Sequence, residues 1–129
     1  MLDDKVQAGY RQLERDKAGC ARAWLSAWSD VLRLCDATGA RSIRELDDRF
    51  PMTQSLYNWG QDLEEALWDA GLHDREALLA RVAVCQEALR RFPREDQLMT
   101  EDRRRALAES YFEVGEADEA EELFGSRLA

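Results

Sequence analysis

The sequence has little of what interrupts helices or crosses membranes. Only two prolines and seven glycines occur in 129 residues rich in Ala, Leu, Glu and Arg, and Val, Ile and Thr are sparse. This balance favours helix, and we find no alternation of apolar and polar residues typical of strands. No run of about 18 apolar residues occurs, as a membrane-spanning helix would need. A chain of this length makes one domain, so we expect a single all-α domain with a real core.

Positive charge is outnumbered by negative charge. The chain has 18 Lys and Arg against 27 Asp and Glu, which gives a net charge of -9 and a pI near 4.7. Such a field repels phosphate backbones and anionic lipids, which argues against nucleic-acid and membrane partners. A few clustered arginines could form a basic patch, but we interpret them as solvated, ion-paired or complementing helix dipoles. They are Arg90, Arg91, Arg94, Arg103, Arg104 and Arg105.

Cysteine and histidine are few and scattered. Cys20, Cys35 and Cys85 lie within apolar helical patterns, which indicates reduced, buried thiols in a cytoplasmic protein. The start, "MLDDKVQAGY", has neither the basic nor the apolar part of a signal peptide, so we expect a soluble intracellular protein. His73 stands alone, and no CxxC, HExxH, Gly-rich phosphate loop or GxSxG is present. We therefore predict no catalytic residue, no metal site and no cofactor.

Apolar spacing and capping residues predict a series of helices joined by short loops. Short loops make neighbouring helices antiparallel. We expect hairpins over about 3–39, 53–92 and 100–129, with a short helix near 43–50. The expected caps are Asp16, Gly39, Ser42 with Glu45 three residues on, Thr53 or Ser55, and His73 or Asp74.

The last predicted hairpin carries a repeat pattern. In "ALAESYFEVGEADEAEELF", five residues stand at the relative spacings of a tetratricopeptide repeat, a helical hairpin of about 34 residues. They are Ala108, Tyr111, Gly115, Ala120 and Phe124. We expect a turn at Gly115 and a final helix from Asp118. We interpret the acidic residues of this segment as the solvated face of that hairpin, or as a surface for a basic partner.

The stretch "YNWGQDLEEALWDAG", residues 57–71, holds most of the polar chemistry. On a helical projection, Trp59 lies on a broad apolar face with Leu63 and Leu67, whereas Trp68 lies on the opposite side. A helix with aromatic residues on two sides either packs between two layers or presents one aromatic surface to a partner. We favour packing between layers.

Four side chains with oxygen atoms form a stripe between these two faces of the helix. Asn58, Asp62, Glu65 and Asp69 could hold Ca²⁺ or Mg²⁺, or receive a basic peptide. The simpler interpretation, which we prefer, is that they are solvated or paired with arginines, because helix spacing alone lacks the loop geometry of Ca²⁺ sites.

Three segments together resemble a known family. "SIRELDDRFPMTQSLYNWGQDLEEALWDAG", "CQEALRRFPRED" and "ALAESYFEVGEADEAEELF" are similar to bacterial tetratricopeptide-like proteins that often carry a C-terminal SEC-C metal-binding motif. That motif binds zinc through a compact cluster of cysteines and a final Cys or His, which this chain lacks, so zinc does not carry over. The resemblance implies a binding scaffold with no established reaction, and a chain that is part of a longer array.

The residues and the resemblance together predict an all-α array of antiparallel helical hairpins, packed as a tetratricopeptide-like right-handed solenoid. We expect a non-catalytic scaffold that binds a protein or peptide. The sequence is also compatible with a homo-oligomer. The expected binding face consists of Tyr57, Asn58, Gln61, Asp62, Glu65 and Trp68. Two alternatives are a regulatory domain that senses a ligand or metal within a longer SEC-C-type protein, and a hydrolase that uses scattered carboxylates.

Overall fold

The structure, a computed structural model, consists of helices and connecting loops. It describes residues 2–128, with side chains described for residues 2–115, and this part of the chain contains no strand. The helices are α1 (Leu2–Leu13), α2 (Lys17–Thr38), α3 (Ile43–Arg49), α4 (Leu56–Gly71), α5 (Arg75–Arg91) and α6 (Gln97–Leu128). The predicted all-α class is confirmed. None of the described helices combines the length and apolarity needed to cross a lipid bilayer.

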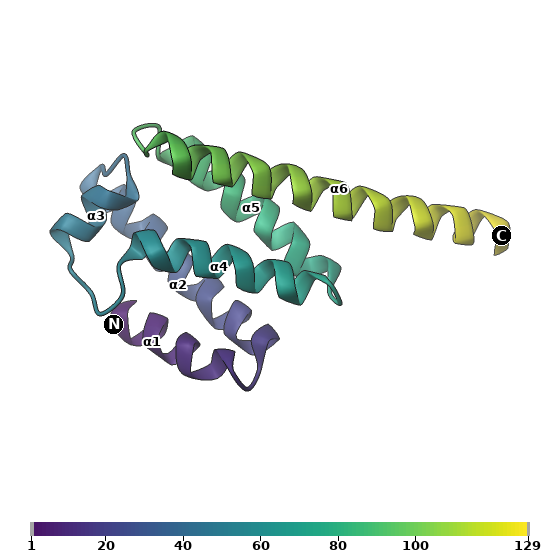
Figure 1. The fold of residues 1–129 in the computed structure, drawn as a ribbon, viewed down its shortest axis with the longest axis horizontal. Coiled ribbons are helices and arrows are strands. Elements are labelled where there is room, and N and C mark those ends of the chain that lie inside the picture. Colours follow the sequence, from purple (N-terminus) through teal and green to yellow (C-terminus); the bar gives the residue numbers. More distant parts are fainter. Residues whose placement is uncertain (1, 129) are drawn as a thin grey trace.

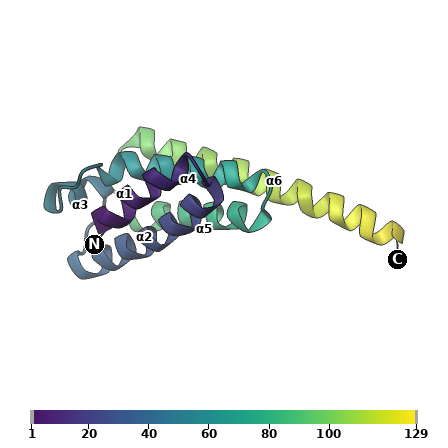
Figure 2. The ribbon, with the colours of Figure 1, turned by 90° about the horizontal axis from the view of Figure 1, so that it is seen from below.

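The helices form two layers through which the chain passes back and forth. Each long helix packs on the next long helix in the chain, α1 on α2, α2 on α4, α4 on α5 and α5 on α6, while short α3 packs on α4 (Figure 1). Turned by 90°, the molecule shows α2 and α5 in one layer and α1, α4 and the first half of α6 in the other (Figure 2). Helix α4 therefore lies between α1 and α6 in its layer and rests on both α2 and α5.

The helix boundaries follow from capping residues. Asp16 accepts a hydrogen bond from the third backbone N–H of α2 at 2.9 Å, and Ser42 does the same for α3 at 3.2 Å. Ser55 and Asp74, rather than their sequence alternatives, cap α4 and α5. Gly39 ends α2 with a φ of 71°, the left-handed conformation that glycine adopts without a steric penalty. These caps confirm the predicted starts of α2, α3, α4 and α5.

The core is centred on two tryptophans. Trp24 of α2 and Trp59 of α4 are fully buried and meet edge to face, with ring centres 6.1 Å apart. Tyr10 of α1 adds a second edge-to-face contact to Trp24, at 4.8 Å. The predicted placement of Trp59 on the core face of its helix is confirmed, and the cluster ties α1, α2 and α4 together.

The C-terminal segment differs from the sequence prediction. We expected a helix from Thr100, a turn at Gly115 and another helix from Asp118, but one helix, Gln97–Leu128, spans the whole segment. A glycine inside a helix costs only about 1 kcal/mol relative to Ala, and the residues around Gly115 are mostly strong helix formers with no proline. Gly115 therefore does not end the helix. Ala120 and Phe124 of the repeat pattern lie outside the residues whose side chains are described.

Candidate functional site

A groove runs between α4, α5 and α6. Its volume is about 290 Å³. Helix α4 supplies one wall, α6 the other and α5 the base; the lining residues are Gln61, Glu64, Glu65, Trp68, Arg81, Asp102, Arg105, Ala106 and Glu109. Four carboxylates face two guanidinium groups in this set, so the groove carries net negative charge together with one aromatic wall.

Arg81 forms the base of the groove and lies against Trp68 of the α4 wall. The Arg81 guanidinium lies 4.8 Å from the centre of the Trp68 ring, a cation–π contact, and Arg81 is only 8% exposed. The Arg81 Nη1 donates to Ser110 Oγ at 3.2 Å and to the Ala106 carbonyl at 3.4 Å, and Nη2 lies 3.8 Å from a Glu109 carboxylate oxygen. Arg81 thus links all three helices, and Trp68 contacts another helix of its own chain.

A buried ion-pair network lies next to the groove. Arg103 of α6 is 4% exposed and donates to Glu95 at 3.1 Å, and its Nε lies 3.9 Å from Glu64. Glu95 also accepts a hydrogen bond from the Ile43 backbone N–H at 3.1 Å, at the start of α3. Burial raises the pKa of Glu64, although Arg103 and Arg81 oppose that rise. The predicted ion pairing is confirmed for Arg103, which the core encloses.

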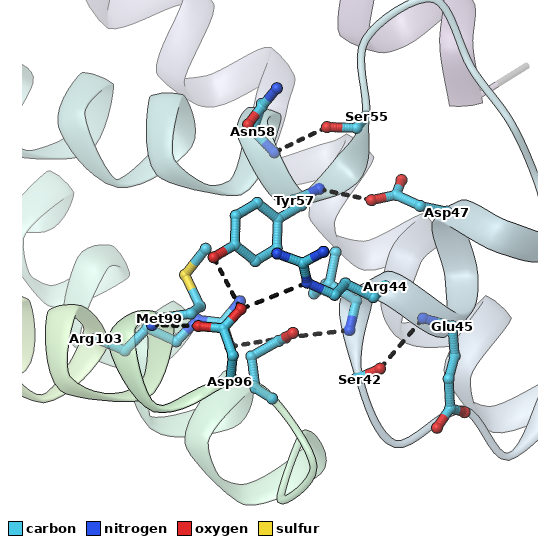
Figure 3. A network of polar contacts seen from close by, with 12 residues as sticks. Ser42, Arg44, Glu45, Asp47, Ser55, Tyr57, Asn58, Asp96, Met99 and Arg103 are labelled. Atoms are coloured by element: carbon cyan, nitrogen blue, oxygen red, sulfur yellow. Dashed lines mark hydrogen bonds and ion pairs between the residues drawn. The ribbon is translucent and has the colours of Figure 1, made fainter.

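A second polar cluster joins α3, α4 and the start of α6 (Figure 3). The Tyr57 hydroxyl donates to Asp96 at 3.0 Å, and Arg44 lies 3.4 Å from the same carboxylate with its guanidinium 4.5 Å from the centre of the Tyr57 ring. Asp96 also caps α6 by accepting a hydrogen bond from the Met99 N–H at 2.8 Å. This cluster fixes the end of the bundle, because it links three helix termini.

The six residues predicted as a binding face do not share one face of the folded chain. Gln61, Glu65 and Trp68 line the groove. Tyr57 and Asn58 line a separate hollow of about 430 Å³ beside α3, where Tyr57 belongs to the cluster just described. The groove therefore collects three of the predicted residues, all of them from the middle or the C-terminal half of α4.

Asp62, the sixth predicted residue, faces α1. It accepts a hydrogen bond from the Tyr10 hydroxyl, and burial together with the Asp62 carboxylate raises the pKa of Tyr10. Asp69 of the same stripe lies 3.9 Å from the Lys17 ammonium. Among the described residues, no group of three His, Cys, Asp or Glu could hold a metal ion. Two members of the stripe thus contact groups of this chain, in line with the preferred interpretation that the stripe is paired rather than a cation site.

The base and the far wall of the groove were not predicted from the sequence. Arg81 left a signal, because it lies among apolar residues of the α5 pattern, between Leu78 and Cys85, where a charged side chain needs a partner when buried. Asp102 and Glu109 left none. They are polar residues on a long helix, and only packing decides which of its sides meets α4.

The three cysteines contribute no reactive thiol to the groove. All three are free and buried. Burial raises the pKa of Cys20 and of Cys35 to about 11 and that of Cys85 to about 12. They pack as small hydrophobic residues, as the sequence predicted.

No family model, no curated protein and no solved structure matches this chain. The fold and the groove are therefore the basis for inferring its function.

Proposed function

We propose that this protein is a non-catalytic scaffold of the bacterial cytoplasm that binds a protein or peptide in the groove between α4, α5 and α6. One observation carries the proposal. The groove presents an aromatic ring, two guanidinium groups and four carboxylates from three helices, and it is open to solvent. Such a mixture of an aromatic anchor with polar groups suits a peptide, whose side chains and backbone need both kinds of contact.

The passage of the chain between two layers supports a tetratricopeptide-like arrangement. Helices α1, α4 and α6 alternate in sequence with α2 and α5, and successive long helices pack on one another (Figure 2). In a repeat array of that type, helices of one layer line an extended binding surface. The groove lies between two such helices, α4 and α6, with α5 beneath them. We include in this proposal that the helices form a right-handed solenoid and that the chain is related to SEC-C-type proteins.

The proposal is tested by peptide selection. A phage-displayed library of random peptides is selected on the whole protein, and the enriched peptides are titrated by fluorescence anisotropy against the wild type, Glu65→Lys and Glu14→Lys. Glu65 is exposed in the groove, whereas Glu14 is exposed at the end of α1, so both variants make the same change of charge. We expect Glu65→Lys to weaken binding about tenfold and Glu14→Lys to leave it within about twofold. Equal affinities of the two variants would remove the groove as the binding site.

A further inference from the structure

We propose that the groove continues along α6 past Glu109, and that its occupant is a basic amphipathic segment whose apolar side covers Phe112. This inference rests on the proposed function and names the chemistry of the partner. It concerns α6, the wall of the groove that extends past α4 and α5. Helix α6 has 32 residues and its neighbour α5 has 17, so α6 runs far beyond the ends of α4 and α5 (Figure 1).

Phe112 lies on the groove side of α6. It follows Arg105 by seven residues and Glu109 by three, which is about two turns and one turn of helix, so it continues the line of residues that walls the groove. Its side chain is 63% exposed. An exposed phenyl ring placed one turn beyond a polar groove is an apolar contact point for whatever lies in that groove.

Tyr111 provides the contrast. It is 51% exposed, but it lies about 100° away from Phe112 around the helix axis and shares a hydrogen bond with Gln86 of α5. Tyr111 therefore points away from the groove line, and two exposed aromatic residues next to each other in sequence serve different sides of α6.

Charge complementarity selects the occupant. Glu65, Asp102 and Glu109 line the groove, and Glu113 continues their line one turn beyond Glu109. Lysine or arginine side chains of a partner would meet these carboxylates. A second copy of this chain would bring the same acidic wall against itself, which like-charge repulsion disfavours.

A second observation also points to an occupant. Arg81 is more than nine-tenths buried at the base of the groove, and its Nε is buried without a hydrogen-bond partner among the described residues. A buried donor without an acceptor costs free energy. A backbone carbonyl of a bound segment, after a small rotation of the guanidinium, would supply the missing acceptor.

The test uses two model peptides on the full chain. One is a fluorescein-labelled amphipathic helix with Lys on one face and Leu on the other, and its counterpart carries Glu in place of Lys. Anisotropy titrations compare wild type, Phe112→Ala and the matched control Tyr111→Ala, with circular dichroism to verify that each variant folds. We expect the wild type to bind the Lys peptide and not the Glu peptide. Phe112→Ala should weaken binding about tenfold and Tyr111→Ala less than twofold, because only Phe112 loses a buried apolar contact.

Three outcomes would overturn the inference. Equal binding of both peptides by the wild type would show that the groove does not select a basic partner. Equal effects of the two alanine substitutions would show that the binding surface does not continue along α6 to Phe112. If Glu65→Lys still weakened binding of the selected peptides, the proposed function would nevertheless stand. A wild-type dimer in sedimentation velocity that Phe112→Ala converts to a monomer would assign the surface to a second copy of this chain.

Discussion

Gly9 of α1 lies directly against the indole ring of Trp24 in α2. A Cβ placed on Gly9 would lie 1.9 Å from the Trp24 Nε1, much closer than two such atoms can approach. The same Nε1 donates a hydrogen bond to the Val6 carbonyl at 3.1 Å, almost one helical turn before Gly9. The missing side chain at position 9 therefore allows α1 to pack against the central tryptophan, and α1 in turn contacts the middle of α4 through the hydrogen bond from Tyr10 to Asp62.

Substituting Gly9 by alanine should destabilise the fold. The new methyl group must displace either the buried indole or α1, and overpacking of this kind costs about 1 to 3 kcal/mol. Urea denaturation measures the change in the free energy of unfolding. Gly60→Ala is the matched control, since a Cβ at Gly60 inside α4 would meet no atom within 4 Å beyond the backbone of its own helix and its chain neighbours, and it should stabilise by up to about 1 kcal/mol. A Gly9→Ala protein as stable as the wild type would contradict the packing described.

Removing the Arg103 side chain should cost about 3 to 5 kcal/mol of stability. Glu95, whose side chain is 1% exposed, and the largely buried Glu64 would then lose the charge that compensates theirs. The measurement is the free energy of unfolding of Arg103→Ala. Arg90→Ala breaks an exposed pair with Glu87 and should leave stability nearly unchanged. Similar losses in the two variants would show that the buried network is weaker than its burial indicates.

Stability should depend on pH through Glu64. Its pKa is higher in the folded chain than the ordinary 4.5, because burial disfavours the carboxylate. The folded state thus holds this proton more tightly than the unfolded state, so the contribution is complete below pH 4.5 and is lost as pH rises through the folded-state pKa. The stability of wild type relative to Glu64→Gln should therefore fall as pH rises above about 4.5.

The pH experiment has a control on the same helix. Glu65→Gln removes an exposed carboxylate next in sequence to the buried one. Urea unfolding of all three proteins over the same pH range separates the effect of burial from the general effect of removing a negative charge. A difference between wild type and Glu64→Gln that stays constant with pH would contradict the prediction.

The three thiols should resist alkylation in the folded protein. Each is buried, and the raised pKa values leave almost no thiolate, the reactive form, near neutral pH. Mass spectrometry after iodoacetamide treatment should detect no labelled chain without denaturant, and three labels in urea, one for each cysteine of the sequence. Rapid labelling of one thiol without denaturant would mean that its helix opens locally.

Local signals were enough to predict most of the helices. Capping residues such as Asp16 and Ser42, the left-handed Gly39 and the proline after α5 act within a few residues of the helix end that they define. The prediction was wrong at Gly115, where a glycine signal for a turn competed with flanking residues of high helix propensity. A single glycine carries too little free energy to decide such a competition alone.

The candidate site was much harder to predict. Helical projection placed Trp59 in the core and Trp68 on the opposite side of α4, and both placements agree with the burial of Trp59 and the contact between Trp68 and Arg81. Projection could not say that Asp62 would face α1 and Glu65 the groove, because a projection orders the sides of one helix and does not show which neighbour covers each side.

By itself the sequence determined the helical class, most helix ends, the core face of α4 and the acidic character of the surface, since propensity, capping and periodicity act along the chain. Only the tertiary structure decided that Arg81 lies under Trp68, that Arg103 is enclosed with Glu95, and that α6 extends past its neighbours. These relationships join residues distant in sequence. They depend on which helices pack together and on how far each helix is shifted along its neighbour.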